Sequence, residues 1–194
     1  MENNYSEKIT LRKCYLEKRN AISSHEKLKL DDLLLIQFQR LSFSDVHTLM
    51  SFWPMPHSNE PNTILYSSYL RHTIPDLQIA YPVSNFAKHT MQAVVINDGT
   101  IYQQNKFHIT EPQDGENIEA LDIDLIFVPL VVCDIKGFRV GYGKGFYDRF
   151  LANCKEDILK VGFSYFSPVE NIKDVHKFDI PLDYCITPES VYEF

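Results

Sequence analysis

The stretch GFRVGYGKGFYDR, residues 137–149, gathers residue types that can bind a phosphate group. Its glycines lack a Cβ, so their backbone N–H groups can approach an oxyanion closely. Arg139 can hold a phosphate through two parallel hydrogen bonds, whereas Lys144 supplies a movable point charge. The GxGxG spacing at residues 141–145 matches neither the GxxxxGK[ST] loop nor the GxGxxG fingerprint. The stretch predicts phosphate binding, and the alternative is a flexible turn with solvated charges.

Asp148 follows this loop, in the first turn of a predicted helix. A carboxylate at that point interacts favourably with the helix dipole, which is a purely structural role. The chemical alternative is a magnesium ligand, because magnesium is commonly held by one or two carboxylates together with substrate phosphates. Spacing alone does not choose a second acidic ligand among Asp134, Asp179 and Asp183.

The loop must be positioned by the elements on either side of it. The run DLIFVPLVVCD, residues 124–134, is continuously apolar, which is typical of a strand buried on both faces. We expect this strand to end near Cys133 and a helix to occupy residues 144–154. Ligands of open α/β sheets bind beyond the carboxyl ends of the strands, so the loop lies where a ligand site is expected.

Apolar periodicity and turn residues predict the remaining elements. We expect helices at residues 5–22, 23–41 and 62–72. We expect strands at residues 45–53, 77–82, 158–164 and 184–187. The sequence NDG between 91–96 and 100–107 predicts a hairpin, and 111–122 reads as a loop. Alternating helices and buried strands indicate one α/β domain over residues 1–194, with a mostly parallel central sheet flanked by helices.

Composition limits the classes of partner. The chain has 194 residues, 44% of them hydrophobic, and a net charge of −7, which disfavours a broad electrostatic contact with nucleic acid. No apolar run reaches the roughly 20 residues that span a bilayer, and MENNYSEKIT lacks the apolar segment of a secretion signal. The four cysteines form no CxxC pair. We expect a cytoplasmic protein with reduced thiols and no membrane partner.

The stretch DIKGFRVGYGKGFYDRFL, residues 134–151, resembles the signature of the 5-formyltetrahydrofolate cyclo-ligase family, also called methenyltetrahydrofolate synthetases. Other segments resemble the family in the same order along the chain. They are Lys8 and Arg12 in KITLR, Glu60, AYPVS at 80–84, FHITEP at 107–112, and FDIPLDYCIT at 178–187. The resemblance covers nearly the whole chain, from Lys8 to Thr187.

The resemblance implies a fold similar to that of sugar-phosphate isomerases and coenzyme A transferases. It also implies a reaction, the ATP- and Mg²⁺-dependent conversion of 5-formyltetrahydrofolate to 5,10-methenyltetrahydrofolate. The formyl oxygen is phosphorylated, the neighbouring amine closes the ring, and ADP and phosphate are released. Such chemistry needs no protein nucleophile, so catalysis consists of positioning and stabilisation of phosphoryl charge.

The resemblance assigns roles to individual residues. The implied ATP-binding residues are Lys8, Arg12, Arg139, Gly141, Tyr142, Gly143, Lys144, Gly145, Phe146 and Tyr147. The implied folate-binding residues are Met55, Glu60, Phe107, Tyr142, Gly143, Lys144, Gly145 and Phe146, with Trp53 as a further wall. Catalysis falls to Lys144, Arg139 and Asp148. Magnesium falls to Asp148 and Asp183, with Asp179 as the alternative second ligand, while Asp134 is expected to stabilise the loop.

Four positions depart from the family pattern. Leu130 replaces a frequent glycine, Tyr142 replaces a frequent arginine, Phe146 replaces a tyrosine, and Pro61 replaces a frequent aliphatic residue. Two alternatives therefore stay open: a non-catalytic folate-binding homologue, and a sugar-phosphate isomerase-type enzyme on the same fold. The expected partner is a small folate, with or without a polyglutamate tail, bound by a monomer.

Overall fold

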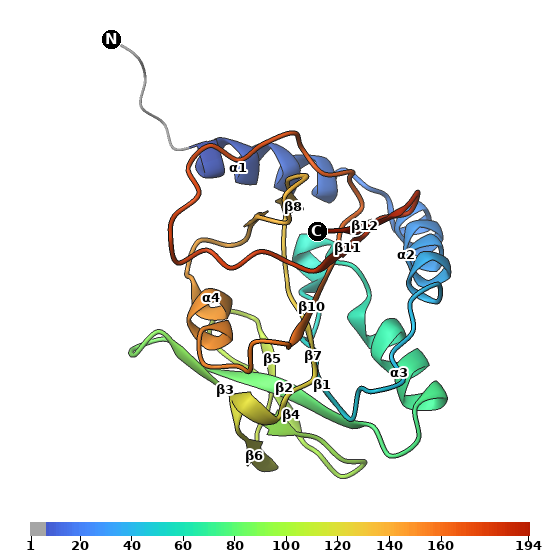
Figure 1. The fold of residues 1–194 in the computed structure, drawn as a ribbon, viewed down its shortest axis with the longest axis vertical. Helices are drawn as coiled ribbons and strands as arrows, with labels where there is room; N and C mark the ends of the chain where they lie inside the picture. Colours follow the sequence, from blue (N-terminus) through green and yellow to red (C-terminus); the bar gives the residue numbers. More distant parts are fainter. Residues whose placement is uncertain (1–6) are drawn as a thin grey trace.

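The computed structural model describes residues 7–194 and is built around one mixed sheet (Figure 1). The strand order is β12-β11-β10-β7-β1-β2-β3-β6. The strands are β1 Thr48–Met50, β2 Gln78–Asn85, β3 Thr90–Val95, β6 Glu116–Ile118, β7 Leu125–Phe127, β10 Leu159–Phe163, β11 Tyr184–Ile186 and β12 Val191–Glu193. The central strands β11, β10, β7, β1 and β2 pair in parallel, whereas β12 pairs antiparallel with β11, β3 with β2, and β6 with β3. The predicted α/β class with a mostly parallel sheet is confirmed.

Helices cover both faces of this sheet. They are α1 Glu7–Asn20, α2 Ser24–Phe38, α3 Thr63–Thr73 and α4 Phe146–Leu151, with 3-10 turns η1 Pro56–Ser58 and η2 Ala120–Asp122. Helices α2 and α3 lie on one side of the sheet and α4 lies on the other (Figure 1). Side chains alternate along β7: Leu125 and Phe127 pack with Phe38 of α2, whereas Ile126 packs with Phe150 of α4.

The long apolar run is buried as predicted, but the prediction of one strand to Cys133 was wrong. Strand β7 ends at Phe127, shortly before Pro129, which has no N–H to donate to a strand ladder. The chain then forms β8, Val132–Cys133, which pairs with β9, Arg139–Val140, in a separate two-stranded ribbon. Helix α1 packs against this ribbon through Leu11 and Tyr15. The glycine-rich stretch therefore begins as a strand.

The predicted hairpin around NDG was also wrong. Asn97 does form a turn, in which its Oδ1 accepts from the Gly99 N–H at 2.8 Å. However, β3 pairs with β2 and β6, while β4, Tyr102–Gln104, pairs with β5, Thr110–Pro112, in a second small sheet. The predicted loop at 111–122 accordingly contains the end of β5, β6 and η2. The turn leads the chain out of the main sheet instead of back along it.

Element ends differ from the predictions in several places. The first helix is observed from Glu7, and the predicted start at Tyr5 falls outside the described residues 7–194. Helix α4 begins only after Gly145, whose φ of 66° is left-handed and breaks the helical path. Across residues 7–194, no helix is long and apolar enough to cross a membrane.

Candidate active site

A cavity of about 450 Å³ lies beyond the carboxyl ends of the parallel strands. Phe52 follows β1, Pro82 lies in β2, and Pro129 follows β7, and all three line it. The other walls come from α1, the segment before η1, the glycine-rich stretch and the segment around Asp179. The cavity therefore occupies the place where open α/β sheets bind ligands.

The glycine-rich stretch forms one wall and is held by α1. The Arg12 Nε donates to the Gly141 carbonyl at 2.5 Å. Gly143 has a φ of 82°, and a Cβ on it would lie 3.2 Å from the Arg12 guanidinium. Glycine is needed here both for the backbone conformation and for this close approach. The exposed Lys144 lies between Gly143 and Gly145 on the cavity wall.

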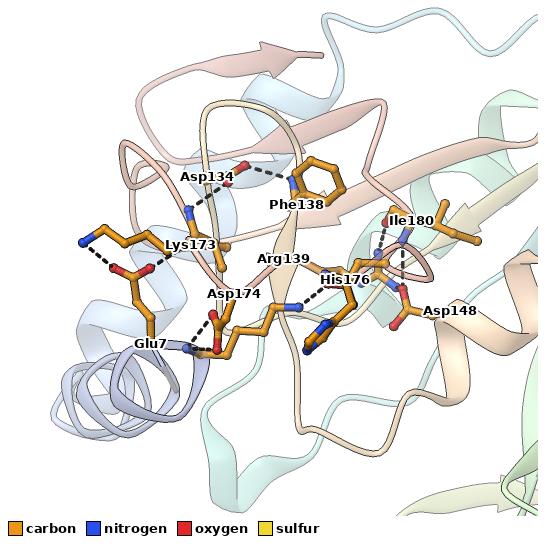
Figure 2. Close-up of polar contacts among 12 residues, drawn as sticks. Glu7, Asp134, Phe138, Arg139, Asp148, Lys173, Asp174, His176 and Ile180 are labelled. Atoms are coloured by element: carbon orange, nitrogen blue, oxygen red, sulfur yellow. Dashed lines mark hydrogen bonds and ion pairs between the residues drawn. The ribbon is translucent and has the colours of Figure 1, made fainter. Parts of the chain in front are cut away.

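Two ion pairs lie on the same side of the cavity. Arg139, whose side chain is only 6% exposed, lies 2.9 Å from Asp148 and also donates to the Ile180 carbonyl (Figure 2). Lys8 pairs with Asp179, which also accepts from the His176 N–H at 2.7 Å. Burial opposes ionisation of Asp179, but the hydrogen bonds from Lys8 and His176 lower its pKa below the ordinary value. This wall thus presents paired, ionised groups.

The other two acidic candidates lie elsewhere. Asp183 is outside the cavity, where it accepts from the Lys160 N–H at 2.6 Å and pairs with the Lys160 ammonium at 2.8 Å. Asp134 is fully buried and accepts from the Phe138 and Ile172 N–H groups, each at 3.0 Å (Figure 2 shows the first of these). Asp134 stabilises the loop, as predicted. The structure brings Asp179 into the cavity with Asp148, and does not bring Asp183 there.

The acidic side chains of the cavity decide whether it could hold a metal ion. Within residues 7–194 there is no cluster of three or more acidic, histidine or cysteine side chains that could hold a metal. Asp148 and Asp179 nevertheless line one cavity, and the carboxylates of both are close enough to Arg139 to interact with its charge. Two carboxylates fit a magnesium ion whose remaining ligands come from substrate phosphates and water.

Glu60 lines the cavity next to Tyr142 of the glycine-rich stretch and is 3% exposed. Its Oε2 accepts from the Met55 N–H at 2.7 Å, and its Oε1 accepts from the Tyr142 hydroxyl at 2.5 Å. Burial raises the pKa of Glu60, although these two hydrogen bonds and the charge of Arg19 oppose that rise. The predicted folate-binding residues Met55, Glu60 and Tyr142 are thus in direct contact.

Arg19, which the sequence analysis did not assign to the site, lies beside Tyr142. It is 2% exposed and donates to the Ser58 carbonyl at 2.7 Å, the Leu130 carbonyl at 3.0 Å and the Tyr142 hydroxyl at 2.6 Å. A signal was available in the spacing. Arg19 is eleven residues after Lys8, about three helical turns, and so lies on nearly the same face of α1.

Aromatic rings frame the rest of the cavity. Phe107 and Phe86 lie 4.0 Å apart between ring centroids, and Phe86 lies 5.2 Å from Phe146. Trp53 packs against Tyr102 at 4.9 Å. The predicted Phe107, Phe146 and Trp53 all line the cavity, and Phe86 is an addition from the turn between β2 and β3. Such rings can stack on a flat heterocycle.

Tyr147 also lines the cavity. Its hydroxyl is buried and has no hydrogen-bond partner among the described residues. Burial, reinforced by the charge of Glu60, raises the pKa of Tyr147, so the hydroxyl keeps its proton. Tyr147 therefore adds an unused donor to the predicted nucleotide-binding span.

Fold and site together define an α/β protein in which a glycine-rich loop and a buried carboxylate line one cavity. The sequence model of the 5-formyltetrahydrofolate cyclo-ligase family matches residues 4–188, and the chain belongs to this enzyme family. The 5-formyltetrahydrofolate cyclo-ligase of Mycoplasma genitalium is 28% identical over 92% of this chain and 98% of its own length. The one of Haemophilus influenzae is 35% identical, and the match spans 61% of this chain and 64% of that protein.

Solved structures agree with this assignment. The 5,10-methenyltetrahydrofolate synthetase of Aquifex aeolicus superimposes with a TM-score of 0.79 at 29% identity, covering 96% of this chain and 92% of that one. The Mycoplasma pneumoniae structure has a TM-score of 0.73 at 24% identity, which supports the fold.

Proposed function

We propose that this protein converts 5-formyltetrahydrofolate to 5,10-methenyltetrahydrofolate with ATP and Mg²⁺, releasing ADP and phosphate. One observation carries the proposal. A single cavity is lined by a glycine-rich loop, by four cations and by the buried carboxylate of Glu60. The cations are Lys8, Arg12, Arg139 and Lys144. Family membership and the named relatives support the same reaction.

The glycine-rich side suits a triphosphate. The backbone of residues 141–145 would approach the phosphate oxygens, and Lys144 would balance the charge of the transferred γ-phosphoryl group. Arg139 and Lys8 line the same cavity, where they form ion pairs with Asp148 and Asp179. The formyl oxygen takes the γ-phosphoryl group as ADP leaves. The neighbouring amine then attacks the activated carbon, and phosphate departs.

The Glu60 side suits the pterin ring of a folate. Each oxygen of this carboxylate has accepted one hydrogen bond from the protein and retains further lone-pair capacity. It can accept from the 2-amino group and the adjacent ring N–H together. Phe107, Phe146 and Trp53 would contact the faces of the ring.

Asp148 and Asp179 are the carboxylates that would hold magnesium. Asp183 is less suitable, because it lies outside the cavity and pairs with Lys160. When bound, the ion would neutralise phosphate charge and fix the orientation of the triphosphate. The monomeric state and the cytoplasmic location stay predictions.

An assay of methenyl formation from 5-formyltetrahydrofolate tests the proposal. Purified protein is expected to form product, with matching release of ADP, only when ATP and Mg²⁺ are both present. Folate binding by folded protein without any product would favour a non-catalytic homologue. Isomerisation of a sugar phosphate without nucleotide would favour the isomerase alternative.

A further inference from the structure

A chain of hydrogen bonds connects Arg19, Tyr142 and Glu60 beneath the cavity. Arg19 donates to the Tyr142 hydroxyl at 2.6 Å, and that hydroxyl lies 2.5 Å from the Glu60 carboxylate. Arg19 and Glu60 are 2% and 3% exposed, so water has little access to either end of the chain. A buried polar chain of this kind is stable only when each member is paired.

We propose that Arg19 and Tyr142 are positioning residues, which fix the carboxylate of Glu60 as a double hydrogen-bond acceptor toward the cavity. Neither residue needs to touch the reacting atoms for this role. The hydrogen bonds that Glu60 would accept from a ligand come from the amino edge of the pterin, and this part of the inference rests on the proposed function.

The direction of the hydrogen bonds supports this role. A guanidinium can only donate, so the Tyr142 oxygen must accept from Arg19. The single proton of the hydroxyl is therefore free to point at Glu60, which accepts it. The Met55 N–H can likewise only donate to Glu60. Both protein contacts thus require an accepting carboxylate oxygen, and its remaining lone pairs are left for a ligand with two donors.

The three donor bonds of Arg19 also connect three segments of the site. The Ser58 carbonyl belongs to η1, just before Glu60; the Leu130 carbonyl follows β7; and Tyr142 lies in the glycine-rich stretch. Because one planar guanidinium bonds all three, the segment carrying Glu60 is held at a set position relative to the loop.

Other titratable and charged groups also face Glu60. They are Arg19, His57, Tyr142, Tyr147 and Tyr165. His57 is exposed, and the Tyr165 hydroxyl is directed mainly at Asp31, at 2.7 Å. Of these groups, Tyr142 is the one whose side chain hydrogen-bonds the Glu60 carboxylate. Removing its hydroxyl therefore isolates the proposed effect.

Tyr142→Phe tests the inference, with Tyr66→Phe as the matched control. Tyr66 is a fully buried tyrosine in α3 whose hydroxyl also bonds a carboxylate, that of Asp31 at 3.2 Å, away from the cavity lining. Both variants are expected to lower Tm by about 2–4 °C, as loss of one buried hydrogen bond does in a chain of this size.

Binding of two probes separates positioning from general stability. Tyr142→Phe should weaken binding of 5-formyltetrahydrofolate about tenfold. Binding of ATP should stay within about twofold of wild type, because the proposed contact of Tyr142 with ATP is through its backbone, which the substitution keeps. Tyr66→Phe should change neither. Unchanged folate binding in Tyr142→Phe, or an equal loss for both probes, would overturn the inference.

A pH titration of ¹³C-labelled glutamate side chains gives a readout that needs no ligand. The Glu60 signal, assigned by its loss in Glu60→Gln, should show a higher pKa in Tyr142→Phe than in wild type, because a hydrogen bond that favours the carboxylate is gone. An unchanged Glu60 pKa would refute the inference. If wild type does not bind 5-formyltetrahydrofolate, the proposed function fails, while this titration still decides the role of Tyr142.

Discussion

The two walls of the cavity hold their charged groups in opposite ways. The part of the lining proposed to hold the nucleotide, here the nucleotide wall, consists of Lys8, Arg139, Gly141–Gly145, Asp148 and Asp179; Asp148 and Asp179 are 26% and 22% exposed, and each is paired with one cation. The part proposed to hold the folate, here the folate wall, is centred on Glu60, which is almost fully buried and accepts hydrogen bonds from the neutral Met55 N–H and Tyr142 hydroxyl. Arg19 bonds that hydroxyl from behind. The pKa of Asp179 is lowered, whereas burial raises the pKa of Glu60.

This difference suits the two kinds of ligand. Partly exposed ion pairs can exchange partners at small cost when phosphate oxygens and a metal arrive, since solvent already screens them. A buried carboxylate with fixed donors cannot rearrange easily, and it presents one geometry to a flat ring. We therefore expect the nucleotide wall to adapt on binding and the folate wall to be preformed.

The largest expected effect is on turnover, from Lys144→Ala on the nucleotide wall. We expect kcat to fall by roughly 10²–10³-fold, as on removal of one donor to developing charge, with Tm unchanged because the side chain is exposed. Lys136→Ala is the control, since Lys136 is an exposed lysine outside the cavity. Similar kcat values for the two variants would contradict a phosphoryl role for Lys144.

Glu60→Gln tests the folate wall. A neutral amide replaces one of the two accepting oxygens by an N–H₂ group, which then faces a protein donor and a ligand donor, so we expect about 10–100-fold weaker binding of 5-formyltetrahydrofolate. Calorimetry with ATP alone should show little change. A parallel loss of ATP affinity would show that the two walls are not separate in function.

Asp179 lines the cavity and Asp183 does not, so the two residues are expected to differ in their effect on magnesium binding. Asp179→Asn should raise the Mg²⁺ concentration for half-maximal activity by roughly 10-fold or more, because a neutral amide replaces one of the two carboxylates proposed to hold the ion. Asp183→Asn should raise it less, because Asp183 pairs with Lys160 outside the cavity. A Mg²⁺ titration of both variants checks the order, and the reverse order would return the metal to Asp183.

The smallest expected effect is the pH dependence of stability, with opposite signs for the two walls. The folded pKa of Glu60 exceeds its ordinary 4.5, so its ionisation destabilises the fold as pH rises from 4.5 through the folded pKa. The folded pKa of Asp179 is below its ordinary 3.8, so its contribution is present above 3.8 and is lost as pH falls through the folded pKa.

Thermal melts over this pH range test the sign. The Tm of Glu60→Gln should gain on wild type as pH rises above 4.5. The Tm of Asp179→Asn should fall further below that of wild type as pH rises toward 3.8. Parallel curves for the two variants would contradict the opposite burial and pairing of these carboxylates.

Local patterns in the sequence predicted the fold class and the glycine-rich loop, whereas the resemblance to the cyclo-ligase family predicted most of the other residues that line the cavity. Gly143 and Gly145 are in left-handed conformations that their residue type permits, and Ser23 begins α2 by accepting from the Glu26 N–H. The failures were long-range. Strand pairing around NDG depends on which neighbour each strand finds, and Pro129 divides a run that is otherwise uniformly apolar.

The same limit applies to the site. The three segments that Arg19 connects are separated from it by 39, 111 and 123 residues along the chain. The spacing from Lys8 indicates the helix face on which Arg19 lies, but a single sequence contains no local signal for the three contacts that Arg19 makes. Asp179 and Asp183 are equally plausible by spacing, and only the turn of the chain between them places one in the cavity and the other beside Lys160.

The central claim is that one wall holds the nucleotide and the other holds the folate. A crystal structure with 5-formyltetrahydrofolate and a non-hydrolysable ATP analogue tests it most directly. We predict the triphosphate at the backbone of Gly141–Gly145 and the amino edge of the pterin on the carboxylate of Glu60. A nucleotide bound away from this loop, or a pterin edge that does not reach Glu60, would contradict it.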